Sequence, residues 1–129
     1  MLDGEKVMIH ADKTGTRSGS RQWIYAGEVF RALFYLTMNG KLGEKYNIVG
    51  EDEVTNLQLA EIIARVARKP LDYELVGFDP ERPGHDVRYG LDGTKLKAMG
   101  FVFETPFNVS FIHVVKWYIN NKEWLGCKK

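Results

Sequence analysis

The order of apolar and polar positions along the chain predicts an alternation of short strands and longer helices. Short apolar or alternating runs predict strands at residues 7–10, 22–25, 46–49 and 73–78, and residues 101–103 form a further candidate strand. Residues 11–20 separate the first two strands. They are polar and rich in glycine, serine and threonine, so this segment is predicted to be a loop.

Three helices are predicted before the last part of the chain, at residues 28–38, 55–67 and 94–99. The second has the clearest start. Thr55 and Gln58 fit a capping box, in which the threonine hydroxyl accepts from an early backbone N–H and the glutamine side chain reaches back.

A final helix is predicted over about residues 106–124, with Thr105 as its N-cap and Pro106 in its first turn. Its apolar residues spread well beyond a single stripe, and such a helix usually touches two neighbours. Because monomeric proteins rarely leave such patches bare, the surplus face is predicted to form a homo-oligomer interface. The alternative is that the whole face packs within one chain.

Composition indicates a single domain over residues 1–129. A hydrophobic content of 44% is enough for a core, and a net charge of +1 disfavours nucleic acid and anionic membranes as main partners. The chain has no run of 18 apolar residues and no charged-then-apolar leader, so a cytoplasmic location is expected. The only cysteine, Cys127, excludes an internal disulfide.

Residues 82–92 carry the strongest sign of chemistry. Pro83 and Gly84 form a turn between Arg82 and His85, and this rigid turn can aim both side chains at one point. Guanidinium groups aimed in this way suit a phosphate or pyrophosphate, whose oxygens match their forked donors. The alternative is that these are solvated charges on an ordinary loop.

Other catalytic patterns are missing from the sequence. It contains no glycine-rich strand-to-helix turn of the dinucleotide-binding type and no phosphate-binding P-loop. His10, His85 and His113 show no ligand spacing with Cys127, so no metal site is expected.

Five segments, in order along the chain, resemble the extended short-chain dehydrogenases, and in particular the dTDP-glucose 4,6-dehydratases. Residues 21–25 resemble an Arg-Asp-Trp-x-Tyr strand of the family, and residues 44–50 resemble its Glu-x-Tyr-Asn-Ile-Gly-Gly strand. Residues 55–57 resemble a helix start, and residues 82–89 resemble an Arg-Pro-Gly-His-Asp-x-Arg-Tyr loop. Residues 117–124 resemble the last helix of the family. The similarity covers essentially the whole chain, but only the C-terminal, substrate-binding portion of the family.

The resemblance implies an α+β (mixed α/β) fold, a small domain of short strands and about four helices, with no Rossmann domain. In the family, the N-terminal part carries the Rossmann sheet, the NAD site and a catalytic Tyr-x-x-x-Lys pair. This chain is therefore expected to bind no cofactor and not to be catalytic alone. The resemblance also implies a Rossmann-domain partner as the alternative occupant of the surplus apolar face of the last helix. Tyr118 and Lys122 have the same spacing, but they lie near the end of the last helix and are interpreted as a core tyrosine and a solvated lysine.

The resemblance also implies four substrate-binding residues. Arg21 matches an arginine that contacts the nucleotide diphosphate, and Asn56 matches an asparagine that contacts the nucleotide from a helix start. Arg82 and His85 match loop residues that hold the diphosphate and the ribose. The position of Asn56 agrees with its role, because the dipole of a helix favours an anion such as a diphosphate at the helix N-terminus.

Gln22 and Val49 depart from the family pattern near the expected site segments, since Gln22 replaces an aspartate and Val49 replaces the first of two glycines. Ile112 and Val114 lie where the family's last helix tends to be more polar. Three functions remain open. The first is a binding module for a nucleotide sugar, with a dTDP-sugar as the expected ligand. The second is a substrate-binding fragment or subunit of an NAD-dependent dehydratase or epimerase. The third is a structural protein that kept the fold and lost the site. The four retained site residues favour the first two.

Overall fold

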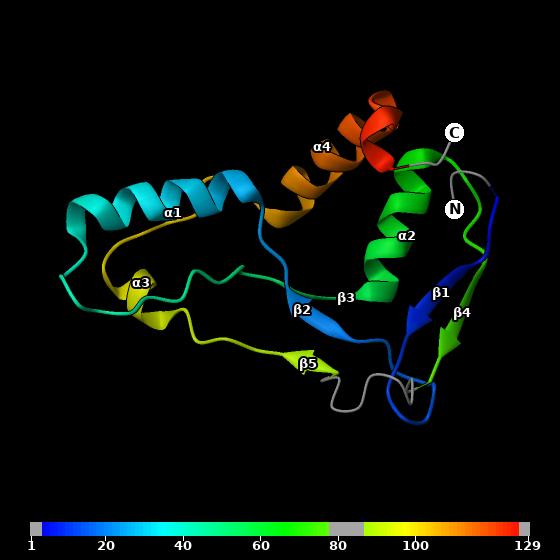
Figure 1. Ribbon diagram of the computed structural model, residues 1–129, viewed down its shortest axis with the longest axis horizontal. Coiled ribbons are helices and arrows are strands. Elements are labelled where there is room, and N and C mark those ends of the chain that lie inside the picture. Colours follow the sequence, from blue (N-terminus) through cyan, green and yellow to red (C-terminus); the bar gives the residue numbers. More distant parts are fainter. Residues whose placement is uncertain (1–3, 78–86, 127–129) are drawn as a thin grey trace.

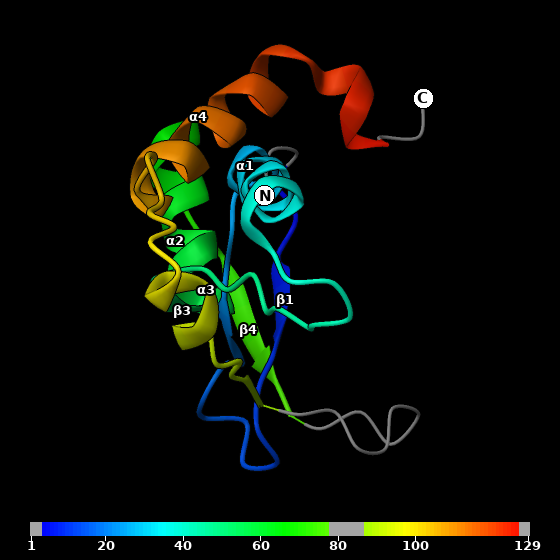
Figure 2. The same ribbon diagram turned by 90° about the vertical axis from the view of Figure 1, so that its left-hand side faces the viewer.

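The computed structural model describes residues 4–77 and 87–126, and within these ranges the chain forms an α+β domain of short strands and four α-helices (Figures 1 and 2). In chain order the elements are β1 (Val7–His10), β2 (Ser20–Gln22), α1 (Ala26–Asn39), β3 (Glu53–Thr55), α2 (Asn56–Ala67), β4 (Tyr73–Val76), β5 (Arg88–Tyr89), α3 (Thr94–Ala98), α4 (Phe107–Asn120) and the 3₁₀ helix η1 (Lys122–Leu125). The predicted fold class is confirmed, and so are the four predicted helices, with changed boundaries.

The strands form two small sheets. β1 and β4 pair in parallel, with Val7 opposite Tyr73 and His10 opposite Val76. In the other sheet, β2 lies in the centre, antiparallel to β3 and parallel to β5. Figure 1 shows β1 and β4 side by side at one end of the molecule, while β2 leads toward α1. The three-stranded sheet positions the candidate site.

α2 begins as the sequence predicts. Thr55 Oγ1 accepts a hydrogen bond from Gln58 N at 3.1 Å, and Gln58 Oε1 accepts one from Thr55 N at 2.8 Å, so the capping box is confirmed. The helix ends at Arg68, whose φ of 53° is the left-handed conformation typical of a helix C-terminus. Its buried residues include Leu59 and Ala64, and the helix packs against α4.

α1 is anchored by its core face and by one buried carboxylate. Ala32 is fully buried beside Phe101 in the hydrophobic core. The buried carboxylate of Glu28 accepts from Arg31 Nη1 at 2.6 Å and from Thr105 N at 3.0 Å. Burial alone would raise the pKa of Glu28, but these hydrogen bonds outweigh it and hold the pKa below its usual range. The charged carboxylate therefore ties α1 to the segment before α4.

Two predicted strands are wrong. Residues 46–49 form no ladder with the described strands. A side chain holds them instead: Asn47 Nδ2 donates to the carbonyl of Asp92 at 3.0 Å. Residues 101–103 are not a strand either. Their apolar pattern arises because their aromatic rings pack into the core beside α1.

Strand boundaries also differ from the prediction. The strand expected at residues 22–25 lies earlier, at Ser20–Gln22, because the chain then turns into α1, whose N-cap is Tyr25. β1 has the predicted bounds, and β4 starts where predicted and ends at Val76; residue 78 lies outside the described part. The sequence predicts neither β3 nor β5, since they are only two to three residues long and partly charged.

α4 is shorter than the helix predicted at about residues 106–124. Asn121 ends it, because its Nδ2 donates to the carbonyl of Trp117 at 2.8 Å and its backbone leaves the helical region. η1 follows as a separate turn. The predicted N-cap is also wrong: Pro106 takes that position, and the N–H of Thr105 donates to the buried carboxylate on α1. None of the described helices is long and apolar enough to serve as a membrane span.

Candidate functional site

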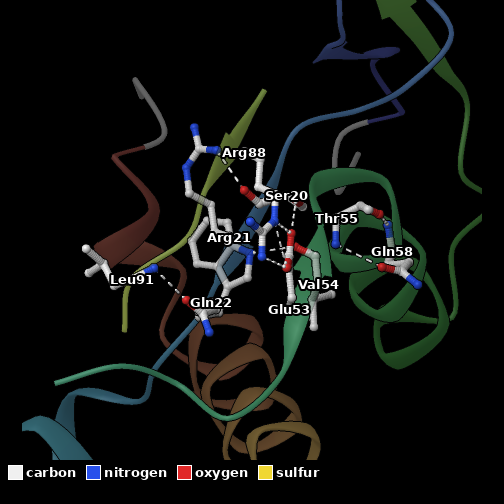
Figure 3. A network of polar contacts seen from close by, with 10 residues as sticks. Ser20, Arg21, Gln22, Glu53, Val54, Thr55, Gln58, Arg88 and Leu91 are labelled. Atoms are coloured by element: carbon white, nitrogen blue, oxygen red, sulfur yellow. Dashed lines mark hydrogen bonds and ion pairs between the residues drawn. The ribbon is translucent and has the colours of Figure 1, made fainter. Parts of the chain in front are cut away.

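β2 separates a candidate binding face from a supporting face, because successive side chains of a strand point to opposite sides. Arg21 is paired with Tyr89 of β5 and shares its face. Ser20 and Gln22 point to the other face, where Ser20 meets Glu53 of β3 (Figure 3).

Glu53 holds the three strands together on the supporting face. It accepts from Ser20 Oγ at 2.6 Å, and from Arg88 Nε and Nη2 at 2.8 Å each. The hydrogen bonds from Arg88 and then from Ser20 lower the pKa of Glu53 to about 2. Arg88 is therefore committed to a carboxylate, and we assign it a structural role.

Arg21 is the cation of the binding face. Its guanidinium carbon lies 4.1 Å from the centroid of the Tyr89 ring, a cation–π contact that holds the guanidinium against the sheet. Its Nη1 donates to the carbonyl of Ser20 at 2.9 Å. Arg21 forms no ion pair with any described carboxylate, so its remaining N–H donors are available to an anion.

Asn56 lies near Arg21 because β3 runs directly into α2. The backbone N–H of Asn56 donates to the carbonyl of Gly19 at 2.8 Å. A Cβ placed on Gly19 would lie 3.6 Å from Asn56 Nδ2 and 3.7 Å from Arg21 Nη1. The missing side chain of Gly19 therefore leaves a space next to both polar groups. The sequence pattern alone does not distinguish this glycine from the other loop glycines, and its place two residues before Arg21 is the signal that could have identified it.

The first backbone donors of α2 are already engaged. The N–H groups of residues 56–58 donate to the carbonyl of Gly19, to Ser18 Oγ at 3.3 Å and to Thr55 Oγ1 at 3.1 Å. The expected attraction of an anion to this helix start thus depends on the dipole and on the Asn56 side chain, and not on open backbone N–H groups.

Arg82 and His85 lie outside the described residues, so their roles stay predictions. The described chain resumes at Val87. The carbonyl of Val87 accepts from Ser20 N at 2.8 Å and lies 3.2 Å from the position of a Cβ on Gly19. The described end of the predicted 82–92 loop therefore borders the binding face. Tyr89 belongs to the same loop, and its role under Arg21 was not predicted.

The two departures near the expected site segments have structural contacts. Gln22 Oε1 accepts from the backbone N–H of Leu91 at 2.9 Å. The Cβ of Val49 lies 3.1 Å from the position of a Cβ on Gly93, so these two segments pass close to each other. Neither contact involves Arg21 or Asn56.

Tyr118 and Lys122 do not form a catalytic pair on one helix face, because α4 ends between them. The prediction of a core tyrosine is wrong, since Tyr118 is 39% exposed and lies edge-on against Trp117, with ring centroids 5.1 Å apart. Lys122 is exposed, as predicted. The described residues contain no group of three potential metal ligands.

The fold is similar to the C-terminal part of dehydratase and epimerase structures. No protein-family model matches the chain. A dTDP-glucose 4,6-dehydratase from Streptomyces niveus is 35% identical over 125 residues, which are 96% of this chain and 35% of the relative. This chain therefore matches the C-terminal part of the dTDP-glucose 4,6-dehydratase family and spans about a third of the length of its relatives.

Solved structures of dTDP-glucose 4,6-dehydratases have the same fold over the matched part. The dTDP-glucose 4,6-dehydratase from Bacillus anthracis, in complex with NAD, superimposes with a TM-score of 0.79 and 30% identity, over 95% of this chain and 37% of the other. The dTDP-glucose 4,6-dehydratase from Streptomyces venezuelae, with NAD and TYD bound, gives a TM-score of 0.77 and 28% identity over the same shares. The predicted resemblance is confirmed.

Proposed function

We propose that this chain binds a nucleotide sugar, with a dTDP-sugar as the expected ligand, through Arg21, Asn56, Arg82 and His85. The main support for the proposal is that Arg21 is held in place but has no described carboxylate partner. Arg88 on the neighbouring strand is neutralised by Glu53, whereas Arg21 is fixed on an aromatic ring without a described carboxylate. An oriented guanidinium beside an amide suits the diphosphate of a nucleotide.

We also propose that the chain alone binds no NAD. A dinucleotide is usually held where a strand passes through a glycine-rich turn into a helix N-terminus. Among the described elements, β1 and α1 are separated by a loop and β2, and the first N–H groups of α2 are engaged. These residues do not fit the cofactor, so a redox step requires a cofactor-binding part beyond these residues.

Isothermal titration calorimetry with dTDP, UDP, GDP and NAD tests both proposals. We expect a pyrimidine nucleoside diphosphate to bind and NAD to give no heat. Arg21→Ala should weaken nucleotide binding about 10- to 100-fold, since hydrogen bonds to a charged group contribute about 1.5–3 kcal/mol. Arg82→Ala should weaken it as well.

Arg65→Ala is the matched control, because Arg65 is an exposed arginine of α2 that forms no ion pair with a described residue. It should bind nucleotide like the unchanged chain. Equal losses in both variants would indicate a general charge effect instead of a site. Failure of every nucleotide to bind would favour the structural protein that kept only the fold.

A second candidate function is supported by the extent of the match. The chain covers only 35–37% of the dehydratases it resembles, and the solved relatives from Bacillus anthracis and Streptomyces venezuelae are complexes with NAD. In this case the chain is the substrate-binding part of an active dehydratase, and a cofactor-binding part must pack against it.

A further inference from the structure

Glu53 contacts the strands that carry the candidate site, but it does so from the opposite face of the sheet. It belongs to β3, and its carboxylate accepts from Ser20 Oγ of β2 at 2.6 Å and from Arg88 Nη2 of β5 at 2.8 Å (Figure 3). The residue after Ser20 is Arg21, and Asn56 comes three positions after Glu53. One carboxylate therefore connects segments that carry proposed binding residues.

The Arg21 guanidinium lies against a carbonyl and a ring, and Glu53 holds the residue behind each of them. Arg21 Nη1 donates to the carbonyl of Ser20 at 2.9 Å, and the hydroxyl of Ser20 donates to Glu53. The guanidinium carbon lies 4.1 Å from the centroid of the Tyr89 ring, and the preceding residue, Arg88, donates to Glu53 through Nε and Nη2. The carboxylate thus fixes both supports of the guanidinium.

The ladder between β2 and β5 is too short to hold the ring by itself. β5 has two residues, both exposed, and it is paired with β2 at two positions. Small pairs of strands are only marginally stable in water. Side-chain contacts must therefore contribute to the position of Tyr89, and the bond from Arg88 to Glu53 is the charged contact next to it.

The geometry of this contact is unusual for the surface of a protein. A single exposed ion pair contributes little, because water screens both charges. Here Arg88 donates two nitrogens to the carboxylate, and Ser20 adds a further donor. The side chain of Glu53 is 33% exposed and that of Arg88 is 65% exposed. We therefore expect the contact to act on orientation more than on the free energy of unfolding.

We infer that Glu53 is a positioning residue of the candidate site, which orients the Arg21 guanidinium toward an anion by bracing β2 and β5 from the opposite face. This inference rests on the proposed nucleotide site and deepens it. A guanidinium that is not held in advance has to be immobilised by the ligand. The entropy cost of one such side chain corresponds to about 2- to 10-fold in affinity.

Calorimetric titration of the 129-residue chain with dTDP at pH 7 tests this role. Glu53→Gln should weaken binding about 3- to 10-fold. In the background of Arg21→Ala the same change should weaken it by less than about 1.5-fold, because the guanidinium through which Glu53 acts is then missing. A carboxylate with a merely structural role would instead weaken binding by the same factor in both backgrounds.

Two further variants make the titration decisive. Glu44→Gln is the matched control, because Glu44 also loses an ion pair, but with Lys95 Nζ of α3, at 2.7 Å. It should bind dTDP like the unchanged chain. Ser20→Ala removes one donor to the Glu53 carboxylate and takes the place of Glu53→Gln if that variant does not fold. Its loss of affinity should likewise disappear when Arg21 is absent.

The Nε–H signal of Arg21 in NMR spectra gives a readout that needs no nucleotide. The face of the Tyr89 ring shields nuclei above it, so this signal, assigned by its absence in Arg21→Ala, should lie upfield of an ordinary arginine signal. Glu53→Gln should move it back toward the ordinary position, and Glu44→Gln should leave it in place.

An Arg21 signal that does not move in Glu53→Gln would overturn the inference, and so would equal losses of affinity with and without the Arg21 side chain. Failure of dTDP to bind to any variant is a different result. It would contradict the proposed nucleotide site, while the NMR signal would still decide whether Glu53 orients Arg21.

Discussion

Glycine has two different roles beside the candidate site. At Gly50 an added Cβ would lie 2.0 Å from the carbonyl oxygen of Trp23, so two backbone segments cross there at a distance that no side chain allows. At Gly19 the added Cβ would enter the space next to Arg21 and Asn56. We therefore expect substitution of the first glycine to affect stability and substitution of the second to affect the candidate binding face.

Gly50→Ala should destabilise the fold by roughly 1–3 kcal/mol, as expected for overpacking at a rigid site. Urea unfolding measures this change. Gly77→Ala is the control, because the nearest atom to its added Cβ is 3.8 Å away, an ordinary contact. A cost of Gly50→Ala no larger than that of Gly77→Ala would contradict the crossing.

Gly19→Val should weaken nucleotide binding by about tenfold or more, since the added methyl groups occupy the space between the two polar groups. The cost in folding free energy should be smaller than for Gly50→Ala, because the closest atom, the carbonyl oxygen of Val87, lies 3.2 Å from the added Cβ. Calorimetry and urea unfolding of the same protein separate the two effects. Unchanged affinity would show that the ligand does not use this space.

Among single residues, the sequence could identify Arg21 and Asn56 as candidate site residues, because both belong to segments that resemble the family. It could not show that Tyr89 supports Arg21, since this contact depends on the register of β2 against β5. Nor could it show that Arg88 is neutralised by Glu53, because these two residues are brought together only by the sheet.

The helices and the strands differed in how well the sequence predicted them. α2 was predicted with its capping box because both signals are local: the apolar spacing and the Thr55–Gln58 pair. β3 and β5 have two or three residues each, and their pairing with β2 is a long-range contact that leaves little pattern in the chain. The apolar run at residues 46–49 has the pattern of a strand but forms no ladder; its Ile48 is partly buried and packs against the hydrophobic core.

The three-stranded sheet should depend on pH through Glu53. Its pKa is lowered from 4.5 to about 2 in the folded state. The folded chain therefore binds this proton less tightly than the unfolded chain, so the stabilisation is complete above about pH 4.5 and is lost as the pH falls toward 2. Glu53→Gln should unfold at a lower temperature than the unchanged chain at pH 7, and the difference should shrink between pH 4.5 and 2.

The control for this experiment is Glu61→Gln, because Glu61 forms no ion pair with a described residue. Its thermal midpoint should follow that of the unchanged chain across the same range. A difference for Glu53→Gln that stays constant from pH 7 to 2 would contradict the role of the carboxylate charge.

For the whole molecule, the sequence predicted the fold class and the family match, but not which surface lies bare. The apolar surplus of the last helix was visible in its composition. That of α1 becomes visible only in the structure, where Leu33 is 52% exposed. Which side of a helix meets the core is decided by the neighbouring elements, here α3 and the aromatic residues after it.

Only residues 23–25 separate the strand that carries Arg21 from α1. Trp23 has little freedom in this connection, because its carbonyl oxygen lies against Gly50 and its Nε1 donates to the carbonyl of Val54 at 3.1 Å. α1 and β2 are therefore joined by a short connection held by these contacts, and we expect a displacement of α1 to displace β2 as well. If binding at either end shifts this connection, thermodynamic reciprocity requires that each ligand change the affinity for the other by the same factor.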